Sequence, residues 1–343
     1  MPVTIKDIAR KAGVSHATVS RALNGSPLIS QETTLAIRKL AEEMGYLPSA
    51  AARGLKTSRS HVLGVIVSRI GNPYFGEIVQ GIEDALKGTA YSIFVASSHL
   101  DAAVEENIVR AFGEHRVDGV IVATASFSRS QVHLLRRYGI PIVAINSSSP
   151  QDYRFCIAHD DVYGARQVAR HLIALGHRRI AYIGNMRAAQ INHDRIVGFK
   201  QEMESAGIAL DANLMINLQW SEIENGVEGM TTLMRRKDRP TAVFCFNDLI
   251  AIGALQVAQR MGIRVPQEIS ITGFDNITYS AYTLPALTTF DQPKRLIGAE
   301  AAGMLLDLIN RRGSGGDDER AAPAARLLRG KLLVRESTAR CMS

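Results

Sequence analysis

One short segment near the start of the chain carries side chains suited to recognising DNA bases. Plotted as a helix, residues 15–24 place Val19, Ala22 and Leu23 on one side, which must pack inward. The opposite side carries Ala17, Ser20, Arg21 and Asn24, with His16 on its flank. A guanidinium, an amide, an imidazole and a methyl group can read guanine, adenine and thymine edges in the major groove. A solvated helix face is the alternative interpretation.

Hydroxyl groups stand where phosphates of a DNA backbone would be held. Thr4, Ser15 and Ser30 lie at predicted helix starts, and Ser20 lies on the exposed face. Hydroxyls and the free backbone N–H groups of a helix N-terminus both bind phosphate oxygens. We therefore expect all four residues to contact the DNA backbone.

Three short helices must position these groups. The first follows Thr4 and ends at Gly13, and the second runs from Ser15 to about Asn24. The third is capped by Ser30 and stopped by Gly45. Short helices joined by a tight turn predict a helix-turn-helix head.

Charge is concentrated in the same region. Residues 1–60 contain nine Lys/Arg and four Asp/Glu, a balance of +5 out of +7 for the whole chain. A compact basic head on a nearly neutral body is typical of nucleic-acid binding.

Composition excludes several classes of protein. Hydrophobic residues make up 46% and charged residues 21% of the 343 residues, as in folded soluble domains. No apolar run is long enough for a membrane span, and the first residues, Met1 to Asp7, lack the apolar core expected of a signal peptide. Three distant cysteines (Cys156, Cys245 and Cys341) predict neither disulfides nor a metal site. We expect a cytoplasmic protein without cofactor or metal, independent of any membrane.

After residue 62 the pattern changes to buried strands that alternate with helices. Strands are predicted at residues 62–67, 91–96, 119–123, 142–146, 180–183, 242–246, 269–272 and 327–334. Continuous apolar strands between helices indicate parallel sheets covered on both faces, and the length favours two α/β lobes. The predicted organisation is a helix-turn-helix domain at 1–47, a hinge helix and linker at 48–61, a two-lobed ligand-binding and dimerisation domain at 62–338, and a tail at 339–343.

The head and hinge resemble a known family. Thr4-Ile5-Lys6-Asp7-Ile8-Ala9, Ala12-Gly13-Val14-Ser15 and Thr18-Val19-Ser20-Arg21 are similar to the DNA-binding head of the lactose/galactose repressor (LacI/GalR) family. Gly45-Tyr46-Leu47-Pro48 and the segment to Leu55 resemble its hinge helix. The resemblance implies that two hinge helices enter the minor groove and that Leu55 wedges into the central base step. Ala52 permits close helix approach, and Lys56 joins the same DNA contact. Without the resemblance, Leu55 would be assigned to a linker or core.

The resemblance continues through the body. Family-like landmarks include Gly71-Asn72-Pro73-Tyr74-Phe75, Leu175-Gly176-His177-Arg178-Arg179, Asn247-Asp248 and Gly273-Phe274-Asp275. The implied fold is a pair of lobes like a periplasmic sugar-binding protein, with a ligand in the cleft between them.

Effector-binding candidates follow from the strand ends, where ligands of such sheets bind. The candidates at these strand ends are Tyr74, Phe75, Asn146, Asn247 and Asp275. Asp248 also follows a strand, but it could cap the next helix as readily as contact the ligand, so Asn247 is preferred. The resemblance adds Arg195 and Trp220, which is the sole tryptophan. Polar groups beside an aromatic ring suit a sugar or sugar derivative, and a nucleobase is the alternative.

No motif of an enzyme is found: the sequence has no Walker loop, no Gly-x-Ser-x-Gly and no paired-histidine metal motif. We predict a ligand-controlled transcriptional repressor that binds a pseudo-palindromic operator as a homodimer. The alternative is a ligand sensor or binding protein that acts without DNA.

Overall fold

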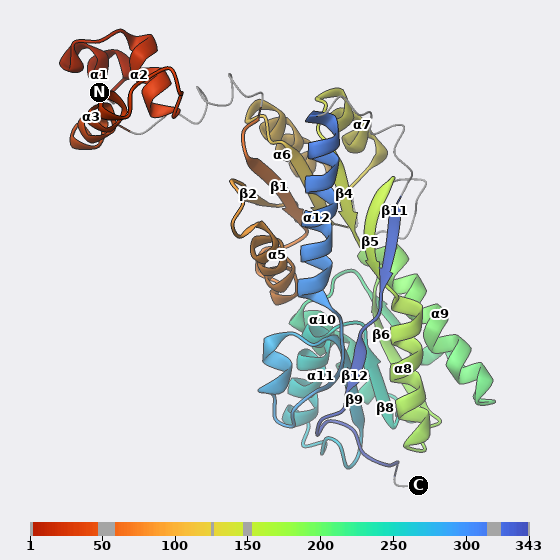
Figure 1. Ribbon diagram of the computed structural model, residues 1–343. Helices are drawn as coiled ribbons and strands as arrows, with labels where there is room; N and C mark the ends of the chain where they lie inside the picture. Colours follow the sequence, from red (N-terminus) through yellow and green to blue (C-terminus); the bar gives the residue numbers. More distant parts are fainter. Residues whose placement is uncertain (1–2, 47–58, 125–126, 147–152, 314–323, 342–343) are drawn as a thin grey trace. The chain divides into compact units, whose positions relative to one another are not determined.

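The computed structural model describes residues 3–46, 59–124, 127–146, 153–313 and 324–341. Its contacts divide the chain into two units, Met1–Ser60 and His61–Ser343, which are described separately (Figure 1).

The first unit is a three-helix head. Its helices are α1 (Ile5–Ala12), α2 (His16–Leu23) and α3 (Gln31–Glu43). Ser15 and Ser30 cap α2 and α3 by accepting the backbone N–H groups of Thr18 and Thr33. Gly13 and Gly45 end α1 and α3 with φ of 67°, a left-handed conformation that glycine adopts without steric cost. The inward faces meet in a small core formed by Ile8, Ala9, Val19, Ala22, Ile37 and Ala41.

The second unit contains two lobes, each built on a six-stranded sheet (Figure 1). The first sheet has the order β11-β5-β4-β3-β1-β2 and is parallel throughout. Its strands are β1 (Val62–Val67), β2 (Ser92–Ser97), β3 (Gly119–Ala123), β4 (Ile142–Ile145), β5 (Phe155–His159) and β11 (Ala324–Leu328). Helices α5 (Pro73–Leu86) and α12 (Lys294–Gly313) share one core with the sheet, and α6 (Ala102–Glu114) and α7 (Arg129–Arg137) share another.

The second sheet has the order β12-β10-β9-β8-β6-β7. Its strands are β6 (Ile180–Asn185), β7 (Met215–Leu218), β8 (Ala242–Cys245), β9 (Ser270–Asp275), β10 (Thr288–Asp291) and β12 (Lys331–Leu333). Helices α8 (Asp161–Ala174), α9 (Ala189–Ser205), α10 (Ile223–Met234) and α11 (Asp248–Arg260) cover it, with short 3-10 turns η1 (Met186–Ala188), η2 (Ala212–Leu214) and η3 (Thr278–Ala281). The predicted class, a helical head and a two-lobed α/β domain, is confirmed.

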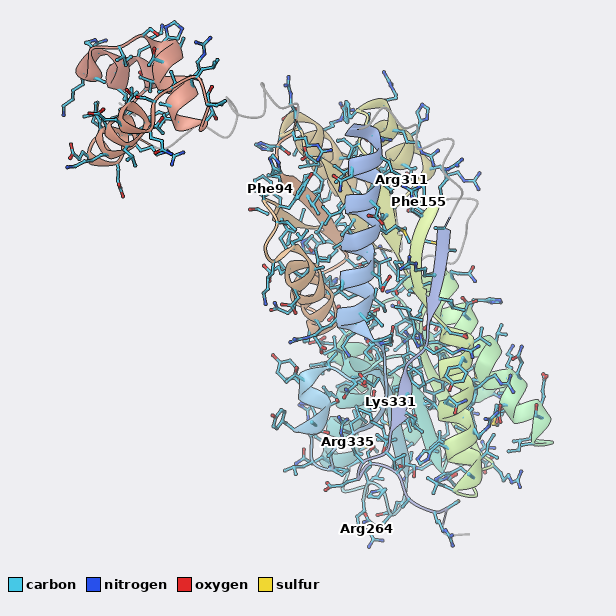
Figure 2. All side chains as sticks on the ribbon, viewed as in Figure 1. Phe94, Phe155, Arg264, Arg311, Lys331 and Arg335 are labelled. Carbon is cyan, nitrogen blue, oxygen red and sulfur yellow. The ribbon has the colours of Figure 1, made fainter. Side chains whose placement is uncertain are left out.

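The chain crosses between the lobes after β5, after β10 and after β11. The single strand predicted at residues 327–334 is therefore wrong, because the segment forms the end of β11 in the first sheet and β12 in the second. Figure 2 labels Phe155 in β5 of one lobe and Lys331 in β12 of the other. At the crossing, a Cβ on Gly330 would lie 1.9 Å from the Asp291 carbonyl oxygen, so only glycine fits.

Helices α5 and α12 cross at a contact that leaves no room for side chains. A Cβ on Gly298 would lie 2.1 Å from the Ile78 carbonyl oxygen, and one on Gly81 would lie 2.1 Å from the Arg295 carbonyl oxygen. We expect Gly298→Ala to lower the free energy of unfolding by about 1–3 kcal/mol, because the two helix backbones must separate.

Gly303 of the same helix is the matched control. It is exposed and a Cβ there would meet nothing within 4 Å, so Gly303→Ala should raise stability by about 0.5–1 kcal/mol. Urea unfolding of Gly298→Ala, Gly303→Ala and the parent protein measures these changes in the free energy of unfolding. Equal effects of the two substitutions would show that the close crossing does not matter.

Candidate DNA-binding face and effector cavity

The exposed side of α2 has the predicted composition. His16, Ala17, Arg21 and Asn24 are exposed, whereas Val19 and Ala22 are buried in the head core. The Asn24 amide is turned back along the helix, where its Nδ2 donates to the Ser20 carbonyl oxygen at 2.6 Å. Arg21 is exposed and its guanidinium can act as a bidentate donor. Asn24 would have to break its hydrogen bond to the Ser20 carbonyl oxygen to donate the same hydrogen to a base.

Three of the four predicted phosphate-binding hydroxyls also act as helix caps. Thr4 Oγ1 donates to the Asp7 carboxylate at 2.6 Å. Ser15 and Ser30 accept backbone N–H groups at 3.1 and 3.2 Å. Ser20 lies half-buried beside Arg21. The predicted hinge contacts Ala52, Leu55 and Lys56 lie outside the described residues.

A cavity opens between the two lobes of the second unit, at the carboxyl ends of the strands. All of the predicted effector residues line it except Asn247. Its charged, polar and aromatic lining includes Arg69, Tyr74, Phe75, Asn146, Asp161, Arg187, Arg195, Trp220, Glu222, Phe246, Asp275 and Gln292.

The buried end of the cavity, called the inner end, is formed around Arg195, Asp161 and Asp275. The side chain of Arg195 is 4% exposed and its Nε donates to the Asp161 carboxylate at 2.8 Å. The guanidinium also donates to the Phe246 carbonyl oxygen, and its Nη2 lies 3.7 Å from the Asp275 carboxylate. The guanidinium carbon, Cζ, lies 3.8 Å from the centre of the Phe274 ring. Arg195 thus compensates two buried carboxylates and stacks on an aromatic ring at once.

These contacts determine the charges of the two carboxylates. Burial raises the pKa of Asp275 to about 6, although Arg195 and Lys294 act against it. Burial is also the largest single influence on the pKa of Asp161 and acts to raise it, but the charge of Arg195 and the contacts with His159 and Arg195 together outweigh burial, so the net shift is downward. Gln292 Nε2 donates to Asp275 at 2.6 Å and fixes its position. At neutral pH the inner end therefore offers two ionised acceptors to a ligand that brings hydroxyl donors.

A series of hydrogen bonds between side chains connects the two lobes beside Arg195, Asp161 and Asp275. Asn146 Nδ2 donates to Tyr74 Oη at 2.8 Å, and Tyr74 Oη donates to Gln292 Oε1 at 3.2 Å. The other amide atom, Asn146 Oδ1, is buried and has no hydrogen-bond partner among the described residues. An unsatisfied buried acceptor that lines a cavity is suited to a ligand donor.

The outer end of the cavity is formed around Trp220. The guanidinium carbons of Arg187 and Arg69 lie 4.1 and 4.9 Å from the centre of the indole ring. Arg69 also lies 3.3 Å from the Glu222 carboxylate, measured from its Nε. Sequence reasoning found Trp220 but missed both arginines, because no residue pattern separates a lining arginine from a solvated one.

Asn247 corrects the predicted site. Its Oδ1 accepts the N–H of Ile250 at 2.9 Å as the N-cap of α11, and its Nδ2 donates to the Ser221 carbonyl oxygen at 3.1 Å. Both ends of the amide are thus used within the protein, and Ser221 lines the cavity instead. Asp248 is not the cap; it is fully buried and accepts from Thr289 Oγ1 at 2.5 Å and from the Ile277 N–H at 2.8 Å.

Asp248 gives the second unit a pH dependence. Burial, and then the negative charge of Asp275, raises its pKa from 3.8 to about 8. Between these values the folded chain holds a proton that the unfolded chain has lost, so the free energy of unfolding falls as the pH rises. We expect a loss of about 1 kcal/mol between pH 7 and pH 8. Urea unfolding at the two pH values should show this slope in the parent protein and not in Asp248→Asn; the same slope in both would exclude Asp248 as its source.

The described parts of the chain contain no group of three His, Cys, Asp or Glu that could hold a metal ion. Within the same residues, no helix is long and apolar enough to cross a membrane.

Comparisons with known proteins agree with this arrangement. Residues 4–49 match the family "Bacterial regulatory proteins, lacI family", and residues 169–338 match "Periplasmic binding protein-like domain". The chain is 34% identical over 308 residues to the HTH-type transcriptional repressor PurR of Pectobacterium carotovorum subsp. carotovorum (strain PC1), covering 89% of this chain and 90% of that protein.

Two solved structures show the same fold. A lac repressor dimer bound to operator and the anti-inducer ONPF has a TM-score of 0.84 at 26% identity and is covered completely by 99% of this chain. A transcriptional regulator, CelR, in complex with cellobiose has a TM-score of 0.72 at 28% identity, over 98% of this chain and 99% of that one. This chain therefore belongs to the LacI family of bacterial transcriptional regulators, with a DNA-binding head followed by a periplasmic-binding-protein-like effector domain.

Proposed function

We propose that the protein represses transcription as a homodimer on a pseudo-palindromic operator, under the control of a sugar or sugar derivative bound between its lobes. The observation that carries this proposal is the cavity, which is lined from both lobes around Arg195, Asp161 and Asp275. A ligand that contacts both lobes favours one arrangement of the lobes over others. Such a preference is the differential interaction that lets an effector change DNA affinity.

The inner end of the cavity favours a polyhydroxylated ligand. Two buried carboxylates and the unpartnered Asn146 Oδ1 are acceptors, and hydroxyl groups supply donors at several angles. Phe75 and Phe246 supply apolar surface for the carbon face of a sugar ring. A nucleobase is the second candidate because the same rings could stack on it.

Dimerisation supplies the two-fold symmetry of the operator. Two heads related by a two-fold axis read two half-sites of one palindrome. The structurally similar lac repressor was solved as a dimer on its operator.

Operator binding in the presence of candidate effectors tests this function. Fluorescence anisotropy should show that one sugar-like compound changes operator affinity by about 5- to 150-fold, as typical coupling energies predict. Neutral sugars, sugar acids and nucleobases are added separately. Unchanged affinity with all of them and with a metabolite extract would contradict control through the cavity.

Leu55→Ala tests the proposed hinge. If Leu55 wedges into the central base step, the variant should bend operator DNA less, because an apolar wedge unstacks and kinks that step. Bending is measured by the mobility of circularly permuted operator fragments. Effector affinity should stay that of the parent. Unchanged bending would mean that another residue, or no residue, acts as the wedge.

A further inference from the structure

The two ends of the effector cavity differ in charge. At the inner end, Arg195 faces two carboxylates, Asp161 and Asp275. At the outer end, Arg69 and Arg187 face one carboxylate, Glu222. Among the lining side chains, the inner end therefore has one more carboxylate than arginines, and the outer end has one more arginine than carboxylates.

Arg187 is the additional arginine of the outer end. Its Nη1 donates to the Leu100 carbonyl oxygen at 3.4 Å, and its guanidinium lies over the Trp220 ring. Across the described ranges of the chain, no carboxylate lies within ion-pair distance of it, whereas Arg69 has Glu222 and Arg195 has Asp161. Neither a carbonyl oxygen nor an aromatic ring neutralises a guanidinium, so Arg187 can still take an anion as a charge-assisted partner.

The two outer arginines also come from different lobes. Arg69 follows β1 in the first lobe, and Arg187 lies in η1 of the second. Both are placed beside the same indole ring, within 5 Å of its centre. An anion between them would offset their mutual repulsion and connect the lobes directly.

We propose that this outer end is an anion subsite, and that the effector is a polyhydroxylated acid whose carboxylate or phosphate binds Arg187 and Arg69. Its hydroxyl groups face Asp161, Asp275 and Asn146 at the inner end. The inference rests on the proposed function, since it assigns the charge of the effector that this cavity takes. It also gives the anion a role in regulation, because the anion is the part of the ligand that engages one arginine from each lobe.

A matched panel tests the ligand chemistry. D-glucose, D-gluconate and D-glucose 6-phosphate differ in charge but share a hydroxylated carbon chain, and D-ribose with D-ribose 5-phosphate extends the set to five carbons. Binding to the full-length chain is measured by calorimetry and by the fluorescence of Trp220, the sole tryptophan. We expect at least one acid to bind at least 10-fold more tightly than its neutral counterpart and to change the emission of Trp220. The carboxylate and phosphate arms distinguish the two sources of the anion.

Arg187→Gln identifies the subsite. Loss of one charge-assisted contact should weaken binding of the preferred acid by about 10- to 100-fold and leave the neutral counterpart within a few-fold. Arg69→Gln should act in the same direction. Arg178→Gln is the matched control, since Arg178 also donates its Nη1 to a backbone carbonyl oxygen in the second lobe but does not line the cavity.

Three results would overturn the proposal. One is tighter binding of a neutral sugar than of its acids; another is an acid whose affinity is unchanged in Arg187→Gln. The third is the absence of binding by every acid at millimolar concentration. None of these results contradicts the proposed function. Control through the cavity is contradicted separately, if operator affinity responds to no compound and to no extract.

Discussion

Arg195→Ala is expected to lower the free energy of unfolding of the effector domain by about 3–5 kcal/mol. The guanidinium is 4% exposed and compensates Asp161 at 2.8 Å and Asp275 at 3.7 Å. Alanine removes the arginine counter-charge from both buried carboxylates, leaving Asp275 with Lys294 alone, and it also removes the donor to the Phe246 carbonyl oxygen. Guanidinium chloride unfolding of the full chain measures the loss, and effector binding should disappear with it.

Arg170→Ala is the control for the loss of an arginine ion pair as such. Arg170 donates to Glu202 at 2.8 Å, but its side chain is 53% exposed, and pairs in solvent contribute about 0–1 kcal/mol. In the Arg195→Ala background, Asp161→Asn should restore part of the stability, because it removes one of the uncompensated charges. Equal losses in the two arginine variants would mean that the Arg195 cluster is not the electrostatic centre described here.

Arg21→Ala is expected to remove sequence discrimination of about 1–3 kcal/mol per half-site, which a two-fold operator doubles. Arg21 is the exposed, bidentate donor of α2, whereas the Asn24 amide is bonded to the helix itself. Loss of a contact to a base changes the ratio of the affinity for operator to the affinity for random DNA, whereas loss of a phosphate contact lowers both affinities together. Anisotropy titrations on the operator and on a scrambled duplex at one salt concentration separate these effects.

Arg38→Ala is the matched control, since Arg38 is also exposed but belongs to α3. It should leave the ratio of the two affinities unchanged. An equal loss by Arg21→Ala on both duplexes would assign Arg21 to the DNA backbone rather than to a base.

Most residues of the inner end of the cavity could be predicted from the sequence, because the carboxyl ends of the strands in a parallel sheet meet at one edge. Tyr74 and Phe75 after β1, Asn146 after β4 and Asp275 at the end of β9 all line the cavity. The same rule does not hold for Asn247 after β8, which does not line the cavity and whose amide acts as the N-cap of α11 and as a donor to Ser221.

Residues whose role depends on the second lobe escaped prediction. Asp161 lies in the first turn of α8, where an acidic residue is common for the helix start alone, yet its carboxylate pairs with Arg195. Gln292 becomes a cavity residue only because the chain crosses between lobes after β10. Strands β5, β7 and β10 are absent from the sequence-based prediction. The four-residue strands β7 (Met-Ile-Asn-Leu) and β10 (Thr-Thr-Phe-Asp) include polar residues, so neither forms a continuous apolar run.

Selection of DNA by the purified protein tests the central claim most directly. Random and genomic fragments are bound at about 100 mM salt, where phosphate contacts alone give only weak, sequence-independent binding. The recovered fragments are sequenced and footprinted, with and without metabolite extract. We predict recovery of a single pseudo-palindrome, with a strength that the extract changes. Recovery of no common sequence under either condition would contradict a DNA-binding repressor and favour a ligand sensor that acts without DNA.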